Sequence, residues 1–256
     1  MNTHKQILMT MTAAVLIAAA GIFAGCKKDD DKVKATGVTV CPTDIMLEIG
    51  KTVPLLATVM PSNADNHSVK WTSTNVDVAT VNADGVVTAL DIGEATVTCT
   101  TNDGGFTDKS IVIVNALRND NDYATLVPGF YFGNMMMDGE TVGENNRITV
   151  RYNSKNKAEF SINESFKVPL MGDIEVPMNV YCTAGMTKNG TGYKAEGKTT
   201  ASMMGMSFDV DIEAIFDGVD KVDMTIYVYK IPMMGDIVIN FTGMGTTEID
   251  PCFLPD

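Results

Sequence analysis

The sequence predicts an all-β protein in which a β-sandwich precedes an eight-stranded, up-and-down antiparallel β-barrel. Residues 35–114 consist of short β-rich runs that Gly, Pro, Asn and Asp separate at regular spacing, which is typical of a sandwich. Residues 126–247 instead alternate apolar and polar side chains with a period of two, as strands with one dry and one wet face do. In this second part PLMGDI at 169–174 nearly recurs as PMMGDI at 232–237, so similar hairpin turns are expected at both places.

The first 25 residues, 1–25, have the pattern of a secretory signal. Lys5 supplies a short basic start, a mostly apolar run follows, and small residues precede Cys26. The ending FAGC resembles the lipobox of bacterial lipoproteins, with Phe23 where leucine is commoner. The resemblance implies that the Cys26 thiol carries a lipid, and the alternative is an ordinary signal peptide.

Residues 26–34 form a charged tether that contains KKDDDK. A solvated spacer explains this composition, and the segment also resembles the short export signals of surface lipoproteins in some Gram-negative bacteria. With a lipid on Cys26, the resemblance implies a protein anchored to the outer membrane and exposed at the cell surface. Such an anchor attaches the chain to the membrane without spanning it.

Charge and composition exclude several classes of partner and reaction. The chain carries a formal net charge of −13 and no basic run. The phosphate backbone of a nucleic acid would repel such an acidic protein, so nucleic acid is not an expected partner. Of two histidines, His4 belongs to the signal and His67 to a loop, which leaves no companion for a histidine-based triad or zinc site. The motifs G-x-S-x-G, H-E-x-x-H, the P-loop and G-x-G-x-x-G are missing from the sequence. We therefore expect no catalytic residues, no metal and no cofactor.

Residues 35–114 resemble a bacterial Ig-like domain of group 2. The resemblance lies in LEIGKTVPLLATVMP, VKWTSTNVDVATV, GVVTALDIGEATVT and the NDGG turn, and it covers nearly the whole segment. Trp71, the only tryptophan, is expected to plug the core. Domains of this family serve mostly as spacers or adhesive stalk units, so the resemblance transfers no catalytic residue.

The remaining residues are predicted to form a linker (115–125), a barrel domain (126–247) and a tail (248–256). Eight sequential antiparallel strands can close into a barrel, which leaves no free edge. The expected strands are 128–137, 145–153, 157–171, 173–184, 192–203, 206–216, 220–232 and 236–243.

The barrel domain resembles the calycin-like, lipocalin-type barrels of bacterial surface lipoproteins. The resemblance lies in PGFYFGN at 128–134, the MGD hairpins and INFTG at 239–243. It implies a cavity for a small ligand. A transmembrane barrel alternates in the same way, but the lipid anchor, the preceding Ig-like domain and the scattered aromatic residues argue against it.

Methionine and glycine dominate the turns after the first, third, fifth and seventh strands, whereas polar residues dominate the other three turns. In an up-and-down barrel the two sets lie at opposite ends, and the methionine end is expected to point away from the linker and the Ig-like domain. Methionines fill irregular gaps or form adaptable binding surfaces, so this end is either an apolar plug or a lipophilic mouth or docking tip. Clustered thioethers also bind Cu(I), but no Cys or His accompanies them. The candidate rim residues are Met135, Met136, Met137, Met171, Met203, Met204, Met206, Met233 and Met234.

Four further cysteines, Cys41, Cys99, Cys182 and Cys252, follow Cys26. Export permits disulfides, and four cysteines allow three pairings. A bond between Cys182 and Cys252 would pin the tail to the fourth barrel strand. Cys41 does not share the alternating positions of the apolar residues in its own strand, which argues against a bond to Cys99. The alternative to any disulfide is that the cysteines are buried free thiols.

Two functional hypotheses follow. In the first, a surface-anchored lipoprotein uses its Ig-like stalk to present a barrel that binds a small hydrophobic molecule or a cell-surface partner. In the second, both domains are structural or adhesive parts of the cell envelope and side chains fill the barrel. An enzyme is a third hypothesis, disfavoured because no catalytic constellation is visible.

Overall fold

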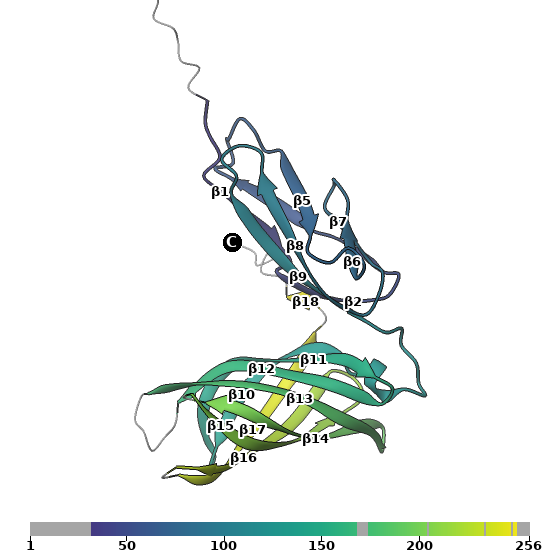
Figure 1. Cartoon of the computed structure of the whole chain (residues 1–256), viewed down its shortest axis with the longest axis vertical. Helices are drawn as coiled ribbons and strands as arrows, with labels where there is room; N and C mark the ends of the chain where they lie inside the picture. The colour runs from purple at the N-terminus through teal and green to yellow at the C-terminus, as the bar shows by residue number, and fades with distance from the viewer. Residues whose placement is uncertain (1–31, 168–173, 204, 233, 247, 250–256) are drawn as a thin grey trace, which may run out of the picture.

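The computed structural model describes residues 32–167, 174–203, 205–232, 234–246 and 248–249. These residues form an Ig-like sandwich and a closed eight-stranded antiparallel barrel (Figure 1), which confirms the predicted fold class. Within the described ranges, no helix has the length and hydropathy that crossing a membrane requires.

The Ig-like domain is built from short strands arranged in three sheets. β1 pairs with β4, β3–β7–β6 form a second sheet, and the largest sheet has the order β18 (Glu248–Ile249), β2, β9, β8, β5. Ile45, Val97 and Val112 are fully buried between the sheets, whereas Trp71 is only partly buried and packs against this core without belonging to its buried members. The strands are β1 (Gly37–Cys41), β2 (Asp44–Glu48), β3 (Thr52–Pro54), β4 (Leu56–Met60), β5 (Val69–Ser73), β6 (Ala79–Val81), β7 (Val86–Ala89), β8 (Gly93–Thr101) and β9 (Thr107–Asn115).

The barrel contains all eight predicted strands in sequential order, and β10 pairs with β17 to close it. The second strand begins at residue 140 rather than 145, because its first residues are polar and do not alternate. The fourth extends to residue 189, because Ala184 and Met186 continue the buried parity. The strands are β10 (Gly129–Met137), β11 (Glu140–Ser154), β12 (Lys157–Lys167), β13 (Glu175–Asn189), β14 (Gly192–Met203), β15 (Met206–Phe216), β16 (Lys221–Ile231) and β17 (Gly235–Thr246).

The inward side chains of the barrel pack into one continuous hydrophobic core. Phe160, Phe166 and Phe241 are almost completely buried, and the rings of Phe160 and Phe216 lie 6.2 Å apart. Tyr131 also points inward, where its hydroxyl donates a hydrogen bond to the carbonyl of Val127 at 2.8 Å. Burial, together with the nearby acidic side chains, raises the pKa of this phenol. Side chains therefore occupy the space in which a calycin-like barrel would hold a ligand.

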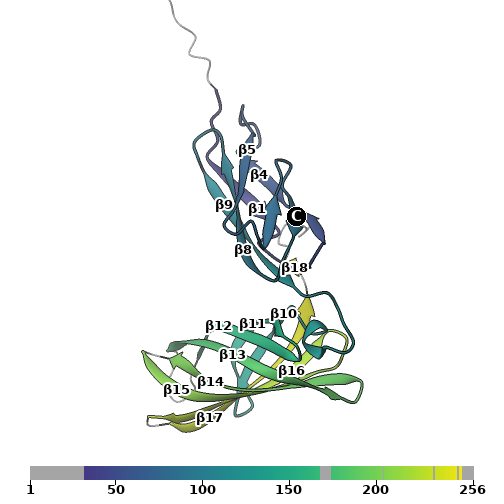
Figure 2. The same cartoon turned by 45° about the vertical axis from the view of Figure 1, so that its right-hand side comes forward.

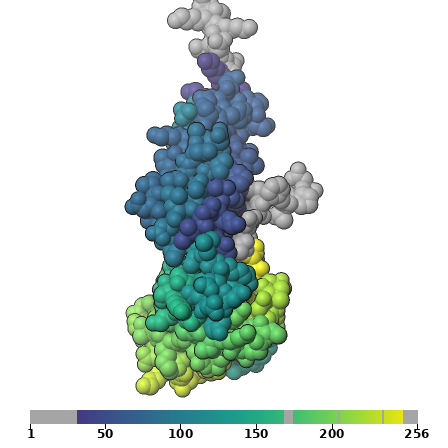
Figure 3. Space-filling model, turned by 90° about the vertical axis from the view of Figure 1, so that its right-hand side faces the viewer, coloured from purple at the N-terminus to yellow at the C-terminus, as the bar shows by residue number. Residues whose placement is uncertain are grey.

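The Ig-like domain rests directly on the wall of the barrel (Figure 3). Met46 and Ile113 of the Ig-like domain form a small buried cluster with Phe130 of β10. Around it, Arg147 forms an ion pair with Asp44 at 3.4 Å.

A second ion pair, between Arg151 and Glu94 at 2.9 Å, and a hydrogen bond from the Tyr152 N–H to Asn115 Oδ1 at 2.8 Å extend the contact. The barrel lies crosswise beneath the Ig-like domain (Figure 1). The expectation that its methionine end points away from that domain is therefore wrong, because the docked wall turns this end sideways.

The chain returns to the Ig-like domain after leaving the barrel. Strand β18 (Glu248–Ile249) pairs antiparallel with β2 and becomes the edge of the five-stranded sheet. Figure 1 shows β18 beside β2, and Figure 2 shows it at the end of the Ig-like domain that faces the barrel. The backbone groups along this edge of β2 are thereby paired, and a free edge is a liability in a β protein. The first two residues of the predicted tail, Glu248 and Ile249, thus join the barrel to the Ig-like domain.

The predicted linker packs against the polar end of the barrel. The Asp122 carboxylate accepts hydrogen bonds from the Asn156 N–H at 2.7 Å and from the Tyr152 hydroxyl at 3.3 Å. The short helix η1 (Tyr123–Thr125) follows, and the Tyr123 N–H donates to Asn156 Oδ1 at 2.9 Å. Asp122 therefore fixes the chain where it enters the barrel.

Candidate ligand-binding site

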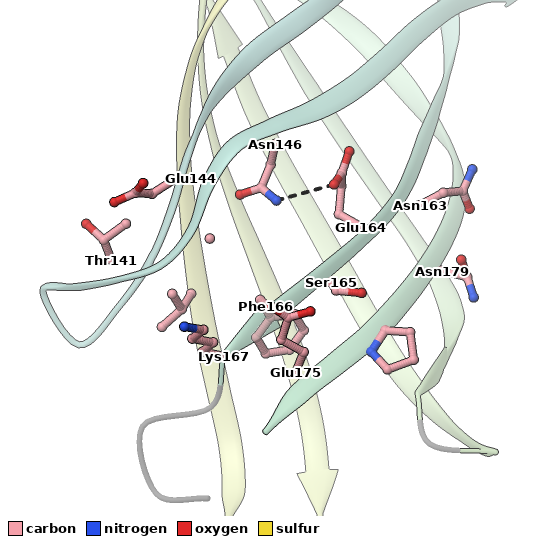
Figure 4. Close-up of a pocket in the computed structure, with 13 residues that line it drawn as sticks. Thr141, Glu144, Asn146, Asn163, Glu164, Ser165, Phe166, Lys167, Glu175 and Asn179 are labelled. Atoms are coloured by element: carbon pink, nitrogen blue, oxygen red, sulfur yellow. Dashed lines mark hydrogen bonds between the residues drawn. The ribbon is translucent and has the colours of Figure 1, made fainter. Parts of the chain in front are cut away.

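The wall of the barrel opens between β11 and β12 at the methionine end. The two strands pair from Ile148 and Ile162 down to Ser154 and Lys157. Within the described residues, positions 140–147 of β11 do not pair with β12, and positions 163–167 of β12 do not pair with β11. The strands diverge there and border a cavity of about 660 Å³, which Figure 4 shows. We call this cavity the wall opening.

Two irregularities in β11 account for the divergence. Gly133 of β10 lies opposite Asn146, Met135 lies opposite Gly143, and the next residue of β10 lies opposite Thr141. Each step places one extra residue on β11, which defines two successive β-bulges. In the first bulge Asn145 adopts a left-handed φ of 53°, and its N–H donates to Asn134 Oδ1 at 3.0 Å. Bulges bend a strand and twist it away from its partner, so β11 leaves β12 at this point.

Two polar side chains occupy inward positions beside the wall opening. Asn146 shares the parity of Ile148 on β11, and Glu164 shares the parity of Ile162 and Phe166 on β12. In Figure 4 they point toward one another across the gap. Sequence analysis missed both residues, although each interrupts an otherwise apolar set of alternating positions. That interruption is the signal that could have identified them.

Glu164 replaces the missing backbone pairing between the two strands. Its carboxylate accepts a hydrogen bond from the Arg147 N–H at 2.9 Å and another from Asn146 Nδ2 at 3.4 Å. Asn146 is only 4% exposed, and no described group donates a hydrogen bond to its Oδ1 atom. Leaving a buried acceptor unpaired costs about 1–3 kcal/mol, and such groups are rare enough to require an explanation.

The remaining lining is polar and acidic. Glu144, Glu164 and Glu175 bring three carboxylates, and Lys167 brings one ammonium group. Amides and hydroxyls supply the other polar groups, and a few apolar residues lie among them. These residues are Asn146, Asn163, Asn179, Thr141, Ser165, Val142, Phe166 and Pro177.

The lack of a side chain at Gly143 leaves room for the Asn146 amide. A Cβ atom added at Gly143 would lie 2.3 Å from Asn146 Oδ1, which is far inside contact distance. We expect Gly143→Ala to push the amide away from Glu164 and to lower the free energy of unfolding by about 1–3 kcal/mol, the cost of overpacking. Thermal unfolding measures the loss, and hydrogen exchange at Arg147 should quicken as its bond to Glu164 weakens.

Gly185→Ala is the matched control, because a Cβ atom there meets its nearest neighbour, the Glu196 carbonyl, only at 4.0 Å. This variant should unfold nearly as the unchanged protein does. Equal stability of the two variants would contradict the tight contact between Gly143 and Asn146.

The predicted methionine rim divides into buried and exposed residues. Met135, Met137 and Met203 are buried, whereas Met136 and Met206 are exposed, and Met234 is partly buried against the core. Met171, Met204 and Met233 lie outside the described residues. A second cavity of about 350 Å³, bordered by Met137, Met234 and neighbouring acidic residues, lies at this end. A ligand or partner at this rim stays a prediction.

The predicted disulfide between Cys182 and Cys252 is wrong. Cys182 is a free, buried thiol, and burial raises its pKa to about 11. It faces the barrel core, as its parity with Val180 requires, which turns it away from any segment outside the wall. Cys99 is also free, whereas Cys41 is disulfide-bonded. Cys252 and Cys26 lie outside the described residues, and among those described no group of His, Cys, Asp or Glu side chains is arranged to hold a metal ion.

Comparison with known proteins confirms the Ig-like domain. Residues 34–112 match the family of bacterial Ig-like domains, group 2. An uncharacterized protein of Clostridium acetobutylicum is 32% identical over 110 residues, which are 43% of this chain and 11% of that protein. The kappa-carrageenase of Pseudoalteromonas carrageenovora is 44% identical over 69 residues, which are 27% of this chain and 17% of the enzyme. The chain thus spans less than a fifth of each of these relatives.

Among solved structures, a lipoprotein from Bacteroides thetaiotaomicron is similar with a TM-score of 0.46 and 13% sequence identity. The match covers 81% of this chain and 99% of that one.

Proposed function

We propose that this chain is a lipid-anchored protein of the outer membrane whose barrel binds a polar ligand at the wall opening. The observation that carries the proposal is the buried Asn146 side chain, whose Oδ1 atom has no donor and which lines a cavity of about 660 Å³ beside Glu164. A cavity of this size with a few convergent polar groups is the usual form of a small-molecule site. The chain acts by binding, without catalysis.

The geometry favours this site over a lipophilic ligand in the barrel interior. Inward side chains such as Phe160 and Ile226 are completely buried in one core. A lipophile would have to displace them, at the cost of native packing. The wall opening needs no such displacement of the core.

The second candidate function is a structural or adhesive envelope protein without a ligand. The packed barrel interior and the docked Ig-like domain support it. The two candidates differ in one respect, because only the first gives the wall opening an occupant.

The proposed anchor is tested at Cys26. The sequence around this residue resembles a lipobox, so we expect Cys26→Ser to leave an unprocessed or mislocalised precursor. Membrane fractionation and intact-mass measurement report the outcome. A variant that is still acylated and still fractionates with the membrane would contradict the anchor.

The proposed binding function is tested by native mass spectrometry of the full chain purified from its source. We expect a small molecule to accompany the unchanged protein and to be lost from Asn146→Leu, which keeps the size of the side chain but removes its amide. Asn240→Ala is the control, because Asn240 is an exposed amide on β17 that does not belong to the lining of the wall opening. A ligand that survives Asn146→Leu, or none in either protein, would support a different site or the structural alternative.

A further inference from the structure

The geometry points to an uncharged, hydroxyl-rich ligand at the wall opening, a mono- or oligosaccharide, one hydroxyl group of which binds between Asn146 and Glu164. This inference rests on the proposed function and deepens it, because it names the class of ligand. Three properties of the lining carry it: its charge, its mixture of donors and acceptors, and its placement of apolar surface.

The charge of the lining excludes anionic ligands. Three carboxylates, on Glu144, Glu164 and Glu175, face a single ammonium group on Lys167. The whole chain is acidic as well, with a net charge of −13. A phosphate, a lipid phosphate or an acidic polysaccharide would approach against this field.

The hydrogen-bonding groups favour hydroxyls over a cationic ligand. Asn179 presents an amide that both donates and accepts, and Thr141 and Ser165 present hydroxyls that do the same. The amide of Asn163 already donates to Ser161 Oγ at 3.2 Å, and its oxygen can accept. An ammonium or guanidinium group only donates, so a cationic ligand would offer the Asn179 N–H groups no acceptor. Sugar hydroxyls satisfy donors and acceptors together.

Asn146 and Glu164 present a defined place for one hydroxyl. The Oδ1 atom of Asn146 needs a donor, and the Glu164 carboxylate has acceptor capacity beyond its two present bonds. Because Oδ1 is buried and lies against Gly143, the segment that contains Gly143 must shift when a ligand enters. The bulged segment 143–145 is suited to this movement, since its left-handed Asn145 is held by one hydrogen bond to Asn134.

The apolar part of the lining matches the C–H faces of sugar rings. Pro177 is exposed at the border of the wall opening, and Phe166 and Val142 form its buried floor. An array of immobilised neutral, amino and acidic oligosaccharides, probed with the full chain in detergent, tests the inference. We expect retention on neutral oligosaccharides, a loss of about tenfold or more in affinity for Asn146→Leu, and unchanged retention of the control Asn240→Ala.

Glu164→Gln separates an uncharged ligand from a cationic one. Glutamine keeps an acceptor oxygen for the Arg147 N–H but removes the charge, so binding of a neutral sugar should change by less than about tenfold, the equivalent of 1.4 kcal/mol. Spermidine serves as the cationic probe in a competition on the same array, and it should not displace the protein. Displacement by spermidine, retention only on acidic oligosaccharides, or no retention at all would each overturn the sugar assignment.

Failure of the sugar assignment can be told apart from failure of the proposed function. If the array retains nothing but a molecule still accompanies the purified protein and depends on Asn146, the wall opening binds another class of ligand. If both measurements are negative, the proposed function fails as well.

Discussion

Replacing Cys41 with serine is expected to lower the free energy of unfolding by about 2–5 kcal/mol, the usual effect of losing a native disulfide. Cys41 is disulfide-bonded, whereas Cys99 and Cys182 are free. Strand β18 pairs Glu248 with Ile45 and Ile249 with Asp44. In the sequence, Cys252 follows Ile249 by three residues and Cys41 precedes Asp44 by three. We therefore predict a bond between Cys41 and Cys252, which would close the chain across both domains.

Peptide mapping without reductant identifies the bond, and thermal unfolding with and without reductant measures its effect. The Cys41 peptide should be linked to the C-terminal peptide. Cys182→Ala is the control, since it removes a cysteine but no disulfide, and reductant should still destabilise that variant. A free Cys41 thiol, or the same unfolding curve for Cys41→Ser and the unchanged chain, would refute the prediction.

Phe160→Ala is expected to destabilise the barrel by about 3–5 kcal/mol, as truncation of a fully buried aromatic residue does. Phe160 is 0% exposed and packs near the Phe216 ring in the barrel core. The expected loss has two contributions: the hydrophobic transfer free energy of the removed ring, and the cost of the cavity that remains in the core. Urea unfolding followed by circular dichroism measures the change.

Tyr181→Ala is the matched control for this second prediction. Tyr181 lies on β13 next to Cys182, which is the register partner of Phe160. The Tyr181 side chain, however, is on the outer face and is 54% exposed. This variant should lose less than about 1 kcal/mol, as surface substitutions usually do. Similar losses in the two variants would mean that the barrel interior is not packed as described.

The alternation of side chains was enough to predict most of the fold. Inward positions such as Phe160, Cys182 and Val210 are buried as their parity requires, because a period of two fixes which face of a strand is dry. The Ig-like domain was identified by its sequence runs, which the family match at 34–112 confirms. Local patterns were sufficient wherever the strands are regular.

The wall opening could not be predicted in the same way. It arises where two bulges remove β11 from the register of β12, and a bulge inserts residues without leaving an apolar period to detect. Asn146 and Glu164 are polar residues at inward positions that are otherwise apolar. Only the arrangement of the strands in the structure reveals that these two side chains lie next to each other. The sequence alone placed the candidate site at the methionine turns.

The contact between the domains also lay beyond sequence reasoning. Arg147 contributes its N–H to Glu164 in the barrel, while its guanidinium reaches Asp44 of the Ig-like domain. Strand β18 contains only two residues, too few for a periodic signal. These links run between residues far apart in the chain, so they depend on the assembled fold. They also hold the Ig-like domain against β11, through Arg147 and Arg151.

The most direct test of the central claim is hydrogen–deuterium exchange of the full chain with and without the neutral oligosaccharide that the array retains best. The claim is that the barrel binds its ligand at the wall opening and not in its interior. Binding there should slow exchange at residues 141–147 and 163–167 and leave β15 and β16, on the other side of the barrel, unchanged. Slowed exchange along β15 and β16, or no change at either border of the wall opening, would contradict the claim.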